Sequence, residues 1–253
     1  MCLSLNLEIK KLPLIQGRYF FRFTTLISKS EWKSITHIFI THGDPDHYWY
    51  ADRVADVASA PVICDKTMVK NIAGKTLMLG PRDKGLAFTT SFKKLHTLSV
   101  DETILLDDMI ITGMKTTHGR LLLKAGPFSK TVKPGSEERI GWGAIGFNIQ
   151  IDGKNIVNLG DTLLHAEEWQ SIRNPDVLMI PIGGKVAHNT MDVEEALQTV
   201  RIMRPKLVIP CHYNCPAFFT KKYNPADDQI FKAEVEKAGA ECVILYANDF
   251  VEV

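Results

Sequence analysis

The chain has 253 residues, of which 45% are hydrophobic and 23% are charged, and its formal net charge is +1. This composition is ordinary for a globular protein, and the balanced charge gives no reason to expect nucleic acid or an anionic membrane as an obligate partner. No apolar run approaches the roughly 20 residues of a membrane span, and we read no signal peptide at the N-terminus.

The five cysteines are odd in number and scattered along the chain: Cys2, Cys64, Cys211, Cys215 and Cys242. This pattern argues against a disulfide framework and predicts a reducing compartment, which we take to be the cytoplasm. We find no internal repeat and no linker rich in Pro or Ser, so we expect one domain over residues 1–253.

The first half of the chain alternates short β-branched runs with helical patterns. The predicted strands here are 34–41, 60–64, 95–100, 102–106 and 109–115, the last three as a meander. The predicted helices are 48–58 and 66–72. The basic stretch 119–143 is rich in Gly and Pro, so we expect irregular structure there.

The second half continues the alternation. The predicted strands are 144–151, 154–159, 177–182, 206–210 and 241–245, and the predicted helices are 192–203 and 227–238. Asp152 and Gly153 indicate a tight hairpin between the first two of these strands. Asp192 and Glu195 are spaced as a capping box for the first helix. The mixture suggests stacked sheets with helices outside.

One short stretch concentrates polar side chains. In FITHGDPDHYW, residues 39–49, a buried strand is followed within six positions by His42, Asp44, Asp46 and His47. Imidazole and carboxylate groups are the common ligands of divalent metals, and a helix that starts here favours carboxylates at its N-terminal end. Taken alone, the stretch is either a metal site or a crowded polar turn.

Three later strand ends carry the same kinds of side chain. His118 follows the strand 109–115, Asp161 follows a Gly turn after the strand 154–159, and His212 follows the strand 206–210. Each by itself is more often a structural residue than a ligand. All four features, however, lie at predicted strand ends.

In their order and spacing these motifs resemble the metallo-β-lactamase superfamily, in which a His-x-His-x-Asp-His motif precedes a His, a bridging Asp and a final His. The segments GFNIQIDGKNIVNLGDT, DVLMIPIGGKVAHNTMDVEEA and RPKLVIPCHYN are similar to uncharacterised metal-dependent hydrolases related to ascorbate-6-phosphate lactonase. The resemblance runs from about residue 35 to the C-terminus. It implies a four-layer αββα sandwich, with metals at one rim of the two sheets.

The resemblance also implies two divalent ions, most readily zinc. One is expected on His42, Asp44 and His118, and the other on Asp46, His47 and His212, with Asp161 as the bridge. Asp44 stands where the family normally has His. This harder ligand favours manganese or iron or weakens one zinc site, unless the exchange is nearly neutral. The first 34 residues show no clear version of the family's usual beginning.

The function expected from the resemblance is hydrolysis of a small, anionic ester, lactone or phosphodiester by a metal-bridging hydroxide. Asp161 would position the metal pair, and Asp46 would also orient the nucleophile. His188 lies between a glycine pair and the next helix. It either donates a proton or holds an oxyanion, or it only caps that helix. Cys211 and Cys215 receive no catalytic role.

Basic residues close to His118 are Arg120, Lys124, Lys130, Lys133 and Arg139. They would either steer an anionic small-molecule substrate toward the metals or form an ordinary solvated charge run. Because relatives often assemble, we also expect a homo-oligomer.

Four other functions stay open. A nuclease of the ribonuclease Z kind shares the ligand set, but the chain is not basic overall and has no recognisable arm that would clamp tRNA. An open dinuclear site could also hydrolyse β-lactams slowly. Asp44 leaves room for a non-catalytic scaffold with a weakened metal site, and for a redox di-iron protein, which carries a carboxylate at the same motif position.

Overall fold

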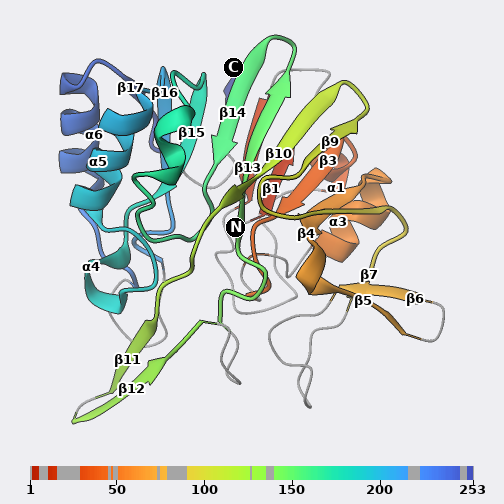
Figure 1. Ribbon diagram of the computed structural model, residues 1–253, viewed down its shortest axis with the longest axis horizontal. Helices are drawn as coiled ribbons and strands as arrows, with labels where there is room; N and C mark the ends of the chain where they lie inside the picture. The colour runs from red at the N-terminus through yellow and green to blue at the C-terminus, as the bar shows by residue number, and fades with distance from the viewer. Residues whose placement is uncertain are drawn as a thin grey trace.

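The computed structural model describes residues 2–5, 11–15, 29–44, 47, 51–72, 75–78, 90–125, 127–134, 140–215, 223–245 and 250–252. Two mixed β-sheets lie face to face, and helices cover both outer faces (Figure 1).

The first sheet contains six described strands. In order across the sheet these are β18 (Phe250–Glu252), β2 (Lys11–Ile15), β1 (Cys2–Leu5), β3 (His37–Ile40), β4 (Val62–Asp65) and β8 (Leu95–Leu98). Strands β3, β4 and β8 are parallel to one another. Helices α1 (Lys29–Trp32) and α3 (Ala51–Ala58) pack on the outer face of this sheet through Trp32, Ala51 and Val54.

The second sheet contains seven described strands. In order these are β17 (Glu241–Cys242), β16 (Leu207–Cys211), β15 (Val177–Pro181), β14 (Lys154–Asn158), β13 (Ile145–Ile151), β10 (Met109–Lys115) and β9 (Thr103–Leu106). Helices α5 (Val193–Met203) and α6 (Asp228–Lys237) and the short helix η2 (Glu168–Ser171) cover its outer face. Helix α4 (Gly184–Ala187) follows β15.

Side chains that alternate along each strand connect the sheets to each other and to the outer helices. In β15, Val177 and Met179 lie in the hydrophobic core between the sheets. The intervening Leu178 and Ile180 pack with the side chains of α5 and α6. Because successive side chains of a strand point to opposite faces, a continuous apolar run is what a strand covered on both sides requires. Phe39 of β3 packs in the same inter-sheet core.

Several predicted boundaries agree with the structure. The strands at 34–41, 60–64, 144–151, 154–159, 177–182 and 206–210 and the helices at 192–203 and 227–238 all form, with ends shifted by up to three residues. The hairpin at Asp152 and Gly153 has the two positive φ angles, 50° and 72°, that its tight turn needs. The capping box also forms, since Asp192 accepts the Glu195 amide and Glu195 accepts the Asp192 amide. The helix predicted at 48–58 is described from Ala51 onward.

The helix predicted over 66–72 is wrong in its second half. Residues Lys66–Met68 form a single 3₁₀ turn, η1, which the Asp65 carboxylate caps by accepting the Thr67 amide at 2.8 Å. The chain then extends as β5 (Val69–Ile72), which pairs with β6 (Lys75–Met78) and through it with β7 (Thr90–Ser91). The β-branched residues at both ends of β5 favour this extended pairing over a helix.

The predicted meander over 95–115 is split between the two sheets. Strand β8 pairs in parallel with β4 in the first sheet, whereas β9 and β10 pair antiparallel in the second. Asp101, with φ of 64°, turns the chain between them. A strand pattern predicts extended structure but not the partner, which tertiary packing decides.

The prediction of irregular structure over 119–143 is also wrong in part. Strands β11 (Leu121–Ala125) and β12 (Phe128–Val132) form an antiparallel hairpin that projects from the body at the same end as α4 (Figure 1). Three consecutive leucines at 121–123 hide the alternation that would have indicated a strand. The strand predicted over 241–245 is shorter than expected, ending at Cys242.

Candidate metal centre

Six of the seven expected ligands lie together. His42 follows β3, His118 follows β10, Asp161 follows β14 and His212 follows β16, and these strand ends meet at one rim of the sandwich. Asp44 and His47 join them from the segment after β3. Asp46 lies outside the described residues, so its expected role as ligand and catalytic group stays a prediction.

Asp161 is the centre of this cluster. Its Oδ2 atom lies 2.8 Å from Nε2 of His212, 3.5 Å from Nε2 of His47 and 3.8 Å from Nε2 of His118. The residue is only 2% exposed. Its other oxygen, Oδ1, is buried and has no hydrogen-bond partner among the described residues. A buried carboxylate oxygen without a donor is costly, and a bound cation would compensate for that cost.

A glycine turn aims Asp161 at the cluster. Gly160 has φ of 60°, and its amide donates to the Asn158 side chain at 3.0 Å. A Cβ atom at position 160 would lie only 2.6 Å from the Thr41 side chain, next to His42. Glycine therefore lets β14 and the end of β3 approach closely enough for their polar residues to meet.

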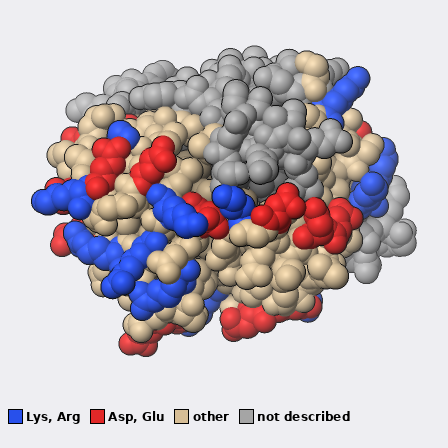
Figure 2. All heavy atoms as spheres, turned by 90° about the horizontal axis from the view of Figure 1, so that it is seen from above, with Lys and Arg blue, Asp and Glu red and all other residues tan. Residues whose placement is uncertain are grey.

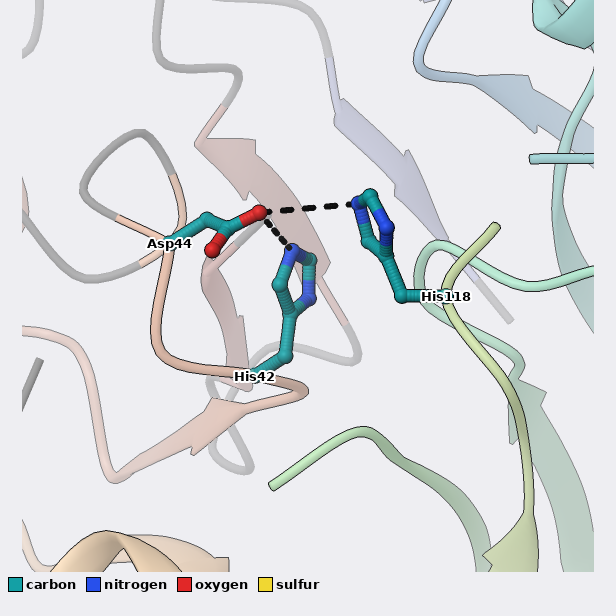
Figure 3. Close-up of side chains that lie close together, drawn as sticks. All are labelled: His42, Asp44 and His118. Carbon is teal, nitrogen blue, oxygen red and sulfur yellow. Dashed lines mark ion pairs between the residues drawn. The ribbon is translucent and has the colours of Figure 1, made fainter. Parts of the chain in front are cut away.

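Asp44 is more exposed than the histidines it contacts, and its carboxylate points toward His42 and His118 (Figure 3). Its Oδ2 atom lies 3.4 Å from Nε2 of His42 and 3.5 Å from Nε2 of His118. Its Oδ1 atom accepts the backbone amide of Gly141 at 3.0 Å. The carbonyl of Trp142 accepts the Gly43 amide at 2.8 Å, so the segment before β13 holds this loop at two successive residues. No sequence motif pointed to Gly141 or Trp142.

Backbone and hydroxyl groups orient two of the histidines. Nδ1 of His118 lies 2.7 Å from the carbonyl oxygen of Gly119, which leaves Nε2 facing the carboxylates. The Gly119 amide in turn donates to the Asn189 carbonyl at 2.7 Å. Nδ1 of His42 lies 3.1 Å from the Thr41 hydroxyl, and its buried Nε2 has no hydrogen-bond partner among the described residues. Ring nitrogens held in this way are typical of metal-ligating histidines.

The charge states fit a metal centre. Burial raises the pKa of Asp161, but His212, His42 and His118 outweigh it and hold that pKa well below its ordinary value. For Asp44, burial is likewise outweighed by His42, His118 and the Gly141 amide, so its pKa is also lowered. Burial and the neighbouring His42 lower the pKa of His118. Ionised carboxylates and a neutral imidazole are the forms that bind divalent ions.

Two groups of ligand atoms are compact enough to hold an ion. One contains His42, Asp44 and His118, and the other contains His42, His47 and Asp161, each with its atoms within 4.8 Å of one another. Nitrogen and oxygen donors of this kind suit zinc and also manganese or iron. The residues therefore fit a divalent metal, and His42 belongs to both groups.

His188 lies apart from these contacts. It ends α4 in a left-handed conformation with φ of 57°, and it is exposed. Its carbonyl packs against Gly119, where a Cβ atom would come within 2.2 Å of it. Its place beside the loop of His118 is compatible with contact to a substrate, and this role stays a prediction.

Two buried cysteines are poorly suited to act as nucleophiles. Burial raises the pKa of the Cys211 thiol far above its ordinary value, and burial also raises the pKa of Cys64 to about 12. A thiol must ionise to attack a substrate, so these two are unreactive near neutral pH.

The end of the molecule away from α4 carries both acidic and basic side chains (Figure 2). Figure 2 looks down on the end away from α4, where basic side chains gather on the side of α5 and α6 and acidic ones lie beside them. Lys206, for example, pairs with Asp176 at 2.7 Å. No helix among the described residues has the length and apolar character needed to cross a membrane.

Comparison with known proteins gives one family match. A family model described as a beta-lactamase superfamily domain matches residues 19–212. A UPF0173 metal-dependent hydrolase from Natranaerobius thermophilus is 35% identical over 113 residues, which is 44% of this chain and 47% of that protein. A UPF0173 protein from Pyrococcus furiosus is 27% identical over 80% of this chain and 75% of its own length.

Solved structures show the same fold. A metallo hydrolase from Ignicoccus hospitalis has a TM-score of 0.66 at 22% identity, covering 99% of this chain and 97% of that one. A metallo-beta-lactamase fold protein from Bacillus subtilis has a TM-score of 0.57 at 13% identity, covering 88% and 80%. The sequence-based prediction of a metallo-β-lactamase fold is thus confirmed.

Proposed function

Because the chain belongs to the beta-lactamase superfamily, we propose that it is a metal-dependent hydrolase of a small, anionic ester, lactone or phosphodiester. The observation that carries the proposal is the buried cluster in which three histidines surround one Asp161 oxygen while the other oxygen has no hydrogen-bond partner among the described residues. Relatives named as metal-dependent hydrolases in Natranaerobius thermophilus and Pyrococcus abyssi support the same reaction class.

The chain's own residues would divide the work as follows. Asp161, with His47 and His212, would hold the buried part of a two-ion centre, and Asp44, with His42 and His118, would hold the more exposed part. Divalent ions bound there would supply Lewis acidity and a water nucleophile at neutral pH. The fixed rings and ionised carboxylates reduce the reorganisation needed during the reaction.

Zinc is the ion we propose first, with manganese or iron as alternatives because Asp44 is a hard oxygen donor. A carboxylate at this position is also what a redox di-iron protein would carry, which makes that the second candidate. A protein that binds iron and hydrolyses no ester would favour the redox function over the hydrolase.

One domain over 1–253, a cytoplasmic location and a homo-oligomeric state stay predictions.

The direct test combines metal content with turnover. Protein purified without chelator would be assayed for zinc, manganese and iron per chain, and for hydrolysis of bis-p-nitrophenyl phosphate and of a simple lactone. The proposal predicts close to two ions per chain and turnover of at least one substrate. Little metal, together with no turnover after zinc or manganese is added, would instead support a scaffold.

The anionic substrate is proposed from exposed basic residues that lie close in sequence to His118. Arg120 lies two positions beyond His118 and is exposed, as are Lys130 and Lys133 on and after β12. Arg120→Glu should raise KM several-fold for an anionic ester and leave KM for a neutral lactone unchanged. Lys237→Glu, at the exposed end of α6, is the matched control and should change neither. Equal effects of the two variants would argue against steering.

A further inference from the structure

Asn224 contacts a predicted ligand from outside every motif. Its side-chain nitrogen Nδ2 lies 3.0 Å from Nδ1 of His212. The opposite ring nitrogen of His212, Nε2, lies 2.8 Å from the Asp161 carboxylate. Asn224 is 1% exposed, and its amide oxygen Oδ1 is buried without a hydrogen-bond partner among the described residues.

The hydrogen-bond inventory favours the reverse orientation of this amide. A histidine that binds a metal through Nε2 carries its proton on Nδ1, so Nδ1 must donate. An amide nitrogen cannot accept that proton, whereas an amide oxygen can. Exchanging the two ends of the Asn224 amide, which have the same size and shape, gives both the Nδ1 proton and the orphaned oxygen a partner. Leaving that oxygen unpaired would cost about 1–3 kcal/mol.

We propose that Asn224 is a positioning residue, whose side-chain oxygen accepts the Nδ1 proton of His212 and so keeps Nε2 directed at the metal centre. The inference rests on the proposed metal centre but not on any particular substrate.

The surrounding backbone fixes where the amide can lie. A Cβ atom at Gly183 would come within 2.6 Å of the Asn224 Cβ and 2.4 Å of the His212 carbonyl oxygen, so glycine permits close packing of both residues. The Asn214 amide donates to the Asn224 carbonyl at 2.8 Å. Both His212 and Asn224 have φ of 52°, a conformation that such contacts must maintain.

Asn214 supplies a matched control in the same loop. Its side chain donates to the Ala226 carbonyl at 2.9 Å and accepts the Ala226 amide at 3.4 Å. It therefore braces the loop through the backbone, two residues from His212. Asn214→Asp introduces the same negative charge close to the centre as Asn224→Asp does.

The experiment measures zinc affinity by chelator competition for the wild type, Asn224→Asp, Asn224→Leu and Asn214→Asp. Asn224→Asp retains an acceptor for the Nδ1 proton, so we expect affinity within about threefold of the wild type or tighter. Asn224→Leu removes the acceptor and should weaken zinc binding about 10- to 100-fold. Asn214→Asp should lower the melting temperature with little change in affinity.

Nuclear magnetic resonance of the zinc-loaded proteins gives a readout that a purely structural role would not change. The wild type and Asn224→Asp should show a slowly exchanging proton on Nδ1 of His212, assigned by its loss in His212→Gln. In Asn224→Leu this proton should exchange rapidly with solvent. If Asn224→Leu does not fold, the test is whether Asn224→Asp keeps both the slowly exchanging proton and the zinc affinity of the wild type.

An Asn224→Asp variant that loses as much affinity as Asn224→Leu would overturn the inference, as would a wild-type ring proton on Nε2. Failure of the wild type to bind zinc, manganese or iron would overturn the proposed function together with this inference. Zinc binding with the expected variant pattern but no hydrolysis would contradict the hydrolase and still support the role of Asn224.

Discussion

The two carboxylates of the cluster are held in different ways. Asp161 comes directly from the end of a buried strand, its side chain is 1% exposed, and histidines from three separate segments approach one oxygen. Asp44 sits on a loop, its side chain is 14% exposed, and one of its oxygens is occupied by the Gly141 amide. The buried core thus fixes Asp161, whereas the neighbouring segment that contains Gly141 fixes Asp44.

This difference suggests how the centre tolerates Asp where the superfamily usually has His. The Gly141 amide holds Oδ1 and leaves Oδ2 facing His42 and His118 (Figure 3). The shorter Asp side chain can then replace His as a ligand, because the hydrogen bond from the Gly141 amide fixes its orientation. The Asp44 half should therefore bind metal but be the easier half to disturb.

The largest effect is expected from changing the two carboxylates to amides. Asp161→Asn removes the charge shared by three histidines, so both ions should be lost, with zinc affinity falling more than about 100-fold. Asp44→Asn should release one ion and weaken the centre only about tenfold. Metal analysis after dialysis against a weak chelator measures both variants, with circular dichroism to check folding. Equal losses would contradict the difference between the two halves.

The next effect tests the segment behind Asp44. Gly141 has φ of 62°, and a Cβ atom there would lie 2.2 Å from the Cβ of His118. Gly141→Ala should therefore cost about 2–3 kcal/mol of unfolding free energy from backbone strain and overpacking, and should weaken zinc binding.

Gly153→Ala is the matched control for this variant. Gly153 has φ of 72°, but nothing lies within 4 Å of its missing Cβ. Its loss should be limited to about 1 kcal/mol of backbone strain, with zinc binding unchanged. Urea unfolding of both metal-free variants makes the comparison, and equal costs would show that the contact with His118 is unimportant.

A smaller effect is expected on metal preference. Asp44→His restores the nitrogen ligand usual in the superfamily, so zinc should be favoured over manganese by several-fold more than in the wild type. Competition between the two ions on the same protein measures this ratio. An unchanged ratio would mean that Asp44 does not contact the metal.

The smallest effect concerns a buried histidine outside the cluster. His37, on the strand that leads to His42, is 2% exposed and lies 3.0 Å from the Asp107 carboxylate. Burial lowers the pKa of His37 below its ordinary 6.5, although Asp107 opposes the shift. The neutral ring therefore stabilises the fold above about pH 6.5, and this contribution is lost as the pH falls below 6.5 through the lower pKa of the folded state.

Measuring the unfolding free energy of the wild type and of His37→Gln between pH 7.5 and pH 5 isolates the contribution of the His37 ring to stability. The stability advantage of the wild type should shrink by less than about 1 kcal/mol as the pH falls. An advantage that grows in acid would show that the Asp107 contact outweighs burial.

The sequence predicted the parts of the fold that local pattern determines. The apolar run 177–182 was predicted as a strand, and β15 forms over Val177–Pro181. The spacing of Asp192 and Glu195 predicted a capping box, and the helix starts there. Strand β8 was grouped with the wrong strands because the choice of partner depends on residues distant in sequence. The local β11–β12 hairpin was missed because three consecutive leucines at 121–123 hide the alternation of a strand.

The candidate site divides in the same way. The histidines and aspartates were found because they recur at strand ends in a familiar order. Gly141, Trp142 and Asn224 were missed because they act through a backbone amide, a carbonyl and one side-chain amide, which leave no spaced motif.

The most direct test is anomalous diffraction from crystals of the zinc-loaded protein at the zinc edge. We expect two peaks, each about 2.0–2.3 Å from its nitrogen and oxygen ligands. One should lie at His42, Asp44 and His118, the other at His47 and His212, with Asp161 between them. A single peak away from Asp161, or no peak at these residues in fully loaded crystals, would contradict the dinuclear centre.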